Sequence, residues 1–466
     1  MTKARHIAVI DIGKTNAKLA LVDLSTMSEI AVLTRPNEVR PGPPWPHFDT
    51  EGHWTFLLNA LGQFHRSYGV DAISTTTHGA SIVLLNAEGN LAAPILDYEH
   101  DGPTETAAQY DAIRPEFSET GSPRLANGLN VGAQLFWQFS ADAELHARTA
   151  HILTYPQYWG HRLTGQIASD VTSIGCHTDL WVPAKGRFSD LVDRLGISDK
   201  MAPVRKSTDV IGTILPSIAS ATGLSADTPV MCGIHDSNAS LFPHILKQDA
   251  PFSVVSTGTW VIVMSIGGMP AQLDPSRDTL VNVSAMGDAV PSARFMGGRE
   301  FELIQQGHPV EVETVDLAHV LETNLMLLPA VDPTTGPFQG LEMTWHGVEP
   351  PEGSGDRTVA LSFYLALMTA SCLRLTGANG PTIVEGPFAA NAQYLAMLEA
   401  ATGRPVLHSK SATGTSIGAA LLFGSAKSLS SPENTSADMS LSKLRKYAAD
   451  WNSIVSDIRH FQRKPT

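Results

Sequence analysis

The pattern of apolar and polar positions in residues 6–23 predicts two short strands joined by a turn. The first strand ends at Asp11, and Gly13-Lys14-Thr15 form the turn. In the following "NAKLALVD" the apolar side chains recur at every second position, which is the period of a strand and not of a helix. We therefore expect a hairpin with a glycine-containing turn.

The tripeptide Gly13-Lys14-Thr15 also looks like the end of a P-loop. That motif needs a glycine five residues before Gly13, where this sequence has Ala8. It also needs a helix after the lysine, with its N-terminus facing the phosphate, whereas a strand is predicted here. A P-loop is therefore excluded. A plain hairpin with a turn aspartate, Asp11, stays open beside a phosphate site of another kind.

The pattern predicts α/β layers over the rest of the chain. An amphipathic helix is expected at about residues 50–66, capped by Asp49 or Thr50, and strands alternate with helices thereafter. Residues 252–267 again read as a strand, a glycine-containing turn and a strand. The chain thus has two halves that open alike, a weak internal duplication. We predict two domains, residues 1–243 and 244–466.

Composition limits the classes of protein to consider. A chain of 466 residues, 43% apolar and 17% charged, is globular throughout and long enough for two or three domains. The net charge of -14 argues against a nucleic-acid or membrane-surface partner. We expect no membrane span and no signal peptide, and hence a cytoplasmic protein. The scattered Cys176, Cys232 and Cys372 are expected to be core residues.

The two turns offer groups that suit phosphoryl transfer, which needs donors for phosphates, acidic ligands for Mg²⁺ and a carboxylate base. In the first turn Gly13 allows close backbone approach, Thr15 and Asn16 offer donors, and Lys14 or Lys18 adds positive charge.

Thr257, Gly258 and Thr259 would do the same from the opposite side of a cleft. Glycine and threonine also occur in turns for purely local reasons, so a structural role remains the alternative for both turns.

Asp236 is the carboxylate that stands out. It follows the apolar run "PVMCGI", so it lies at a strand end, in a loop with His235. The same residues also fit a helix start with Asp236 or Ser237 as N-cap. His78 ends another strand and suits either a sugar hydroxyl or an ordinary structural contact. Asp97 and Glu99 follow a third strand and suit a polyol, or else are solvated loop acids.

Taken in this order, the segments resemble the FGGY carbohydrate kinases, over about residues 6–425. The matching stretches are "IAVIDIGKTNAKLALVD", "YPQYWGHRLTGQIASDVTS", "VIGTILPSIASATGLSADTPVMCGIHDSNASL", "VSTGTWVIV" and "TIVEGPFAANAQYLAMLEAATGRPV". The resemblance implies two actin-like (ribonuclease H-like) ATPase domains with an interdomain cleft that closes over the substrates.

The resemblance also implies roles for individual residues, with ATP and Mg²⁺ as cofactors. Asp236 would be the general base for the sugar hydroxyl, and Asp11 would hold Mg²⁺ through water. His78-Gly79 falls where xylulokinase-like members carry a substrate loop, and His235 lies beside the base. The nucleotide's surroundings would be Gly13, Thr15, Asn16 and Thr257–Thr259 at the phosphates, and Gly386 and Asn391 near the nucleoside.

Two departures point to the deoxyketose-kinase side of the family. The substrate segment here is "LDYEHDGP", without arginine, and the nucleotide segment has "EGPF" where the family has a glycine triplet. We expect phosphorylation of the terminal hydroxyl of L-fuculose, L-rhamnulose or a pentulose, by an enzyme that forms a homodimer as relatives do. The alternatives are a kinase of another polyol or a diol-ketone signal molecule, a non-catalytic actin-like ATP-binding protein, and an exopolyphosphatase-like hydrolase.

Overall fold

The computed structural model describes residues 4–309, 311–409, 414–424, 433–434 and 441–462, and the chain divides into two compact units. Unit 1 consists of Met1–Lys247, Val281–Ala289 and Thr413–Leu429. Unit 2 consists of Gln248–Leu280, Val290–Ala412 and Ser430–Thr466. Both units are therefore discontinuous in sequence, and the contiguous division at residue 243 stays a prediction of domain boundaries.

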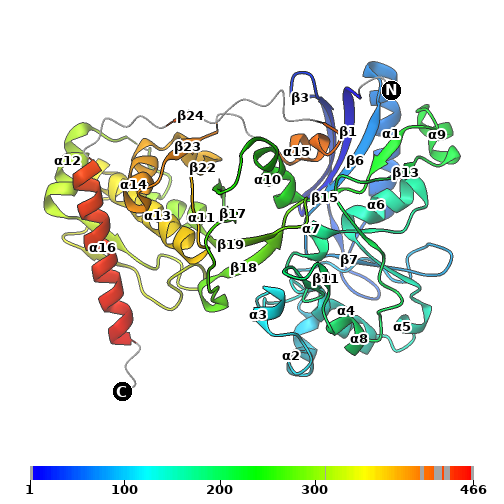
Figure 1. The fold of residues 1–466 in the computed structure, drawn as a ribbon, viewed down its shortest axis with the longest axis horizontal. Helices are drawn as coiled ribbons and strands as arrows, with labels where there is room; N and C mark the ends of the chain where they lie inside the picture. Colours follow the sequence, from blue (N-terminus) through cyan, green and yellow to red (C-terminus); the bar gives the residue numbers. More distant parts are fainter. Residues whose placement is uncertain (1–3, 310, 410–413, 425–432, 435–440, 463–466) are drawn as a thin grey trace. The chain divides into compact units, whose positions relative to one another are not determined.

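A mixed sheet forms the frame of unit 1 (Figure 1). Its central strand pairs antiparallel with the next strand, as the alternating pattern predicted, and parallel with β6. The order across the sheet is β13 (Val210–Thr213), β14 (Pro229–Met231), β6 (Ala72–Thr77), β1 (His6–Ile12), β2 (Asn16–Asp23) and β3 (Ser28–Pro36), and β15 (Ile234–His235) also pairs with β6. The predicted opening hairpin is confirmed.

The second sheet repeats this topology. β16 pairs antiparallel with β17 and parallel with β22, as β1 does with β2 and β6. The order is β18 (Thr279–Val283), β19 (Ala289–Phe295), β17 (Val261–Ile266), β16 (Phe252–Thr257), β22 (Thr382–Glu385), β23 (Val406–His408) and β24 (Glu433–Asn434). The internal duplication that the two hairpins suggested is therefore present in the strand pairing.

The two faces of β1 are covered by different helices. Ala8, Ile10 and Ile12 belong to a core with α1 (Thr50–Tyr68) and α6 (Tyr155–Thr164), whereas Ile7 and Val9 pack with α10 (Asp236–Lys247) and α15 (Thr415–Leu421). Each such side chain is fully buried, which stabilises the fold by about 1.5–3 kcal/mol. Because side chains alternate along a strand, Asp11 lies on the α10 and α15 side.

The predicted helix at residues 50–66 is confirmed as α1. Its N-cap is Asp49, whose carboxylate accepts a hydrogen bond from the Gly52 N–H at 3.1 Å. The other elements of the first 247 residues are β4 (Val39–Arg40), β5 (His47–Phe48), β7 (Ile82–Leu85), η1 (Gly102–Thr106), α2 (Ala107–Asp111), α3 (Phe117–Thr120), α4 (Val131–Ala141), α5 (Leu145–Arg148), β8 (His151–Thr154), β9 (Ser169–Asp170), α7 (Val171–Ile174), β10 (Trp181–Val182), β11 (Arg187–Phe188), α8 (Leu191–Arg194), β12 (Val204–Arg205) and α9 (Pro216–Thr222).

The core of unit 2 is mainly helical. Its long central helix is α13 (Gly355–Leu375), against which α14 (Ala392–Thr402), α12 and α11 pack. The other elements are η2 (Pro275–Arg277), α11 (Gly297–Gln305), α12 (Thr314–Thr323), β20 (Met326–Leu328), β21 (Thr344–His346), η3 (Pro387–Ala390) and α16 (Leu441–Gln462).

Among the described residues, α13 alone is long and apolar enough to span a membrane by length and composition, with a mean hydropathy of 1.5. The sequence-based expectation that no apolar run approaches this length is therefore wrong. The reason is burial: 89% of the apolar window lies inside the structure, as in the core helix of a globular protein.

Candidate active site

Three strands of unit 1 end side by side. Thr77, the last residue of β6, pairs with Ile12 of β1 on one side and with His235 of β15 on the other. All three strands are parallel, so their carboxyl ends meet at one edge of the sheet, where α/β proteins bind ligands. His78 and Asp236, the residues that follow β6 and β15, are therefore brought to the same edge.

Asp236 is the first residue of α10. The predicted loop at this position is wrong, and the helix start that was the alternative is confirmed. Its Oδ1 accepts a hydrogen bond from the Ser237 N–H at 2.6 Å, and the side chain is 34% exposed. Burial raises the pKa of the Asp236 carboxyl, which His78 and the Ser237 hydrogen bonds oppose. A carboxylate with a raised pKa has a stronger affinity for a proton, as a general base needs.

His235 holds the Asp236 carboxylate from one side. Burial lowers the pKa of His235 to about 4, so its ring is neutral at pH 7. The Asn238 amide lies 3.3 Å from Nδ1, and Nε2 lies 3.1 Å from Asp236 Oδ1. With Nδ1 accepting from Asn238, Nε2 carries the proton and lies in close contact with the Asp236 carboxylate. Gly79 leaves room for this ring, because a Cβ there would lie 2.7 Å from Nε2.

His78 presents a hydrogen-bond acceptor. Its Nδ1 donates to the Gly79 carbonyl at 2.8 Å, and burial lowers the pKa of the ring, which is therefore neutral. Within the described part of the chain, Nε2 is buried and has no hydrogen-bond partner. The ring is packed among Phe48, Tyr98 and Tyr155, with centroids 5.1, 5.1 and 5.2 Å away. A buried acceptor without a partner calls for a donor from a ligand.

Lys14 contacts the acids that the sequence suggested for polyol binding. Its Nζ forms an ion pair with Asp97 and lies 3.0 Å from Glu99 Oε2. It also lies 4.8 Å from the centroid of the Tyr98 ring, in a cation–π contact. The structure thus joins Lys14 to the acids and aromatic rings around His78.

Asp11 forms a second cluster on the same edge. Its Oδ2 lies 3.1 Å from Lys18 Nζ, its cross-strand neighbour, and accepts a hydrogen bond from Ser416 Oγ at 3.3 Å. Burial raises the pKa of Asp11, against the effect of Lys18, and the charge of Asp236 raises it further. Although burial lowers the pKa of Lys18, its ion pairs with Asp11 and Glu29 raise it overall.

The first turn leaves two of its backbone N–H groups without an acceptor among the described residues. Asn37 donates hydrogen bonds to two carbonyl groups of this turn. Its backbone N–H donates to Thr15 O at 2.9 Å, and its side-chain amide donates to Gly13 O at 2.8 Å. Of the described residues, none accepts a hydrogen bond from the N–H of Lys14 or Thr15. Two adjacent donors in an exposed turn can bind an anion.

The second turn, in unit 2, is also closed by a hydrogen bond from its glycine N–H, but to the carbonyl two residues on and not three. The Gly258 N–H donates to Trp260 O at 3.0 Å, as the Gly13 N–H donates to Asn16 O at 2.9 Å. Thr257 differs from its predicted role, because its hydroxyl donates to Glu385 O at 2.6 Å and accepts from the Phe388 N–H at 3.1 Å. Thr257 therefore ties β16 to the segment after β22.

Gly386 and Asn391 shape that segment. Gly386 has φ 82°, and a Cβ there would lie 2.0 Å from Thr257 O, so only glycine fits. The Asn391 side chain caps α14 by accepting from the Tyr394 N–H at 2.9 Å, and it donates to Ser362 Oγ at 2.9 Å. Its amide is thus engaged within unit 2.

No group of three or more His, Cys, Asp or Glu side chains in the described residues converges to form a metal site. A single carboxylate such as Asp11 still fits Mg²⁺, which is commonly held by one or two carboxylates together with waters and substrate phosphates. The three cysteines are buried, as predicted, and none of them forms a disulfide in the described part of the chain.

Several residues of this edge were missed in the sequence. Tyr98, Tyr155 and Phe48 form the aromatic surround of His78, and Ser416 reaches Asp11 from 405 positions away. Only "LDYEHDGP", where Tyr98 stands between two acids, carried a local signal.

Comparison with known proteins agrees with this architecture. Residues 6–243 match the description "FGGY family of carbohydrate kinases, N-terminal domain", and residues 249–432 match "Carbohydrate kinase FGGY, C-terminal domain". The crystal structure of a carbohydrate kinase from Novosphingobium aromaticivorans has a TM-score of 0.90 and 33% identity, covering 98% of this chain and 100% of that one.

Two curated relatives from Escherichia coli (strain K12) match over shorter stretches. L-fuculokinase is 30% identical over 288 residues, which is 59% of this chain and 58% of the relative. Xylulose kinase is 26% identical over 258 residues, 54% of this chain and 52% of the relative. The matches thus span somewhat more than half the length of these relatives. From its domain matches, strand topology and full-length structural likeness, the chain belongs to the FGGY family of carbohydrate kinases.

Proposed function

We propose that this protein transfers the γ-phosphoryl group of ATP to the terminal hydroxyl of a small ketose. One observation carries the proposal: a carboxylate with a raised pKa, Asp236, shares one sheet edge with the unpartnered acceptor of His78 and with the Lys14–Asp97 pair. A plain ATP-binding protein has no use for a base and a polyol-binding set at the same edge. Membership of the family supports the reaction class.

Asp236 is the general base of this proposal. It takes the proton from the sugar hydroxyl as that oxygen attacks the γ-phosphorus, the bond to the bridging oxygen of ADP breaks, and ADP leaves with its electron pair. The hydrogen bond from the Ser237 N–H and the close contact with His235 keep the carboxylate oriented while leaving lone pairs for the substrate.

The sugar lies against His78, Gly79, Asp97 and His235 in this proposal. His78 Nε2 accepts a hydrogen bond from one hydroxyl, and Asp97 accepts from another while Lys14 balances its charge. The aromatic surround favours a substrate with an apolar edge, such as the methyl group of a 6-deoxyketose. The likeness to L-fuculokinase supports L-fuculose or L-rhamnulose, and that to xylulose kinase supports a pentulose.

The phosphates of ATP are assigned to the two turns. The free N–H groups of Lys14 and Thr15 supply donors in unit 1, with Asn16 beside them, and the exposed Gly258–Thr259 turn supplies them in unit 2. Gly386 and Asn391 are proposed to shape the nucleoside site through the backbone. Mg²⁺, when bound with ATP, neutralises phosphate charge, and Asp11 would hold it through water while Lys18 fixes the carboxylate.

The test is ADP release from MgATP, measured with coupled enzymes against a panel of sugars. The panel contains L-fuculose, L-rhamnulose, D-xylulose, D-ribulose, aldoses, glycerol and a diol-ketone signal molecule. We expect turnover that depends on a ketose, and a product identified by mass as the sugar monophosphate.

Three other results of this assay would change the proposed function. ATP turnover at the same rate with no sugar present would overturn the kinase proposal in favour of a hydrolase. Binding of ATP without any turnover would favour a non-catalytic ATP-binding protein, and turnover with the diol-ketone or glycerol alone would replace the ketose. We also expect a homodimer, which light scattering of the purified protein measures directly.

A further inference from the structure

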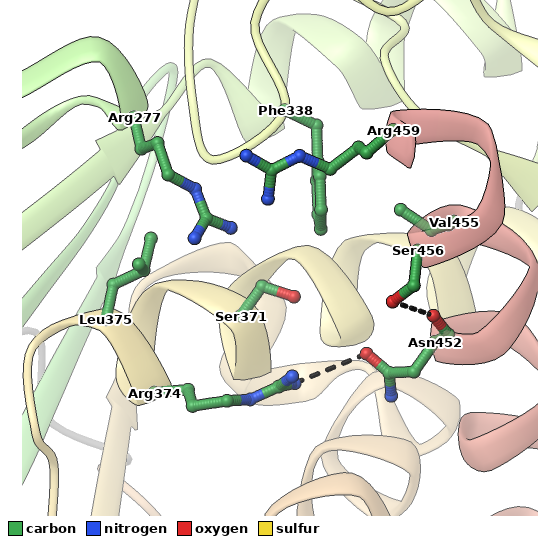
Figure 2. A pocket seen from close by; sticks show the side chains of 9 residues that line it. All are labelled: Arg277, Phe338, Ser371, Arg374, Leu375, Asn452, Val455, Ser456 and Arg459. Carbon is green, nitrogen blue, oxygen red and sulfur yellow. Dashed lines mark hydrogen bonds between the residues drawn. The ribbon is translucent and has the colours of Figure 1, made fainter. Parts of the chain in front are cut away.

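A hollow of about 190 Å³ lies within unit 2, and none of its lining residues belongs to the candidate active site (Figure 2). It is bordered by the end of α13, by the last turns of α16 and by η2. Three arginines, Arg277, Arg374 and Arg459, contribute to its lining, together with the side chains of Ser371 and Asn452.

Two of these arginines face the same ring. The guanidinium carbons of Arg277 and Arg459 lie 5.7 and 5.8 Å from the centroid of Phe338, and Figure 2 shows the two groups close to each other. Burial, followed by the charge of Arg459, lowers the pKa of Arg277 to about 10. An anion beside this ring would be attracted by both guanidinium groups.

Neither Arg277 nor Arg374 forms an ion pair among the described residues, although the charge of Asp274 acts on Arg277 from farther away and raises its pKa. Within the part of the chain that the structure describes, neither guanidinium has a carboxylate within ion-pair distance. Arg277 Nε donates to Pro337 O at 2.9 Å, and Arg374 donates to Asn452 Oδ1 at 3.3 Å, so both contacts are to neutral acceptors. These contacts fix the arginine side chains and leave other N–H donors of each guanidinium for a ligand.

We propose that this hollow binds the phosphate group of a small organic phosphate, held between Arg277, Arg459 and Arg374. The planar guanidinium fork matches the oxygens of a phosphate, and such charge-assisted hydrogen bonds are the strong ones. Three arginines at one hollow also fit the two negative charges of a phosphate monoester better than a single carboxylate.

The organic part of the ligand has space beside the phosphate. A second hollow of about 490 Å³ shares Arg277, Phe338 and Arg459 with the first. Phe338 lines both hollows, and in the second hollow its ring and Leu341 provide apolar surface for a carbon skeleton. A phosphate ion alone would leave this second space without a function.

The experiment measures binding of ribose 5-phosphate, glycerol 3-phosphate, inorganic phosphate and succinate by isothermal titration calorimetry and by the shift in melting temperature. Wild type is compared with Arg277→Ala, Arg277→Lys and Arg374→Ala. Arg445→Ala is the matched control, because Arg445 is an exposed arginine on α16 that does not line the hollow. Melting curves without ligand show which variants remain folded.

We expect an organic phosphate to bind wild type and Arg445→Ala equally. Removal of Arg277 or Arg374 should weaken binding by a factor of about 10 or more, the usual scale for a hydrogen bond to a charged group. Arg277→Lys should recover only part of the loss, since lysine lacks the fork. Binding at the sugar or nucleotide site would not respond to these variants.

Three results would overturn the proposal. Organic phosphates that bind Arg277→Ala and Arg374→Ala as tightly as wild type would place the ligand elsewhere. Inorganic phosphate that binds as tightly as the organic phosphates would remove the need for an organic part. Tighter binding of succinate than of any phosphate would make the site a carboxylate site.

Discussion

Replacing Asp236 with asparagine removes the proposed base with almost no change of shape. The amide oxygen can still accept from the Ser237 N–H, which lies 2.6 Å from Oδ1, so the start of α10 should be kept. What is lost is the proton acceptor. We expect kcat with the preferred ketose to fall by about 10²–10⁴, the usual contribution of general-base catalysis. That corresponds to about 2.7–5.4 kcal/mol in the barrier, at 1.36 kcal/mol per tenfold change.

The stability of the Asp236→Asn variant should change in the opposite direction to its activity. Burial raises the folded-state pKa of Asp236, so the ionised carboxylate disfavours the folded state once the pH exceeds the pKa of the unfolded chain. At pH 7 this cost is present in wild type and absent in the amide variant. The melting temperature should therefore be equal or higher.

The assay combines ADP release, ATP binding by calorimetry and thermal unfolding. Asp227→Asn is the control, because Asp227 is an exposed aspartate that precedes the amino end of β14, whereas Asp236 follows the carboxyl end of β15. The reasoning is refuted if Asp236→Asn retains wild-type turnover. It is also refuted if the variant melts at a lower temperature and loses ATP binding to the same extent as activity, since Asp236 would then be structural.

Three further changes test the surroundings of the base. Gly79→Ala places a Cβ 2.7 Å from His235 Nε2, so the ring must move away from Asp236. We expect kcat to fall by up to about 10²-fold with little change in melting temperature. An unchanged kcat would contradict the packing argument. His235→Phe removes the N–H that lies beside the Asp236 carboxylate and should raise the pKa of Asp236. The acidic limb of the kcat/KM pH profile should therefore move to higher pH. If that limb does not move, His235 does not affect the pKa of the base. Lys14→Ala leaves Asp97 without its cation and should raise KM for the sugar about tenfold, more than KM for ATP, in keeping with a charge-assisted contact. A loss as complete as that of Asp236→Asn would instead make Lys14 part of the phosphate machinery.

Much of the frame was visible in the sequence because it depends on local pattern. Strand alternation and turn glycines identified both hairpins, and the apolar run before His235 placed Asp236 at the end of a strand. The hairpins also suggested the duplication, which the pairing of β1 and β16 with their neighbours confirms. Strands and turns of this kind depend on residues close together in the chain, so the hydrophobic periodicity of the sequence predicts them.

Partners distant in the chain were not visible. Lys14 was expected at phosphates, but its ion pair is with Asp97, 83 positions away, because the loop after Leu96 passes over the first turn. Thr257 was expected to face phosphate, but its hydroxyl is used 128 positions away, at Glu385. A lysine or threonine side chain can donate a hydrogen bond to any acceptor within its reach. Tertiary packing decides which acceptor that is, and the local sequence does not show it.

The position of α15 has a consequence for the order in which the protein is made. Ala419, Ala420 and Leu421 fill the face of the first sheet that Ile7 and Val9 present. During synthesis at 5–20 residues per second, about 10–35 s separate the emergence of Lys247 from that of α15. During that time the apolar face of β1 that packs against α15 in the folded protein remains uncovered by that helix. Unit 1 therefore cannot complete its core during translation until the ribosome has made almost all of the chain, and a chaperone that shields β1 would act in this interval.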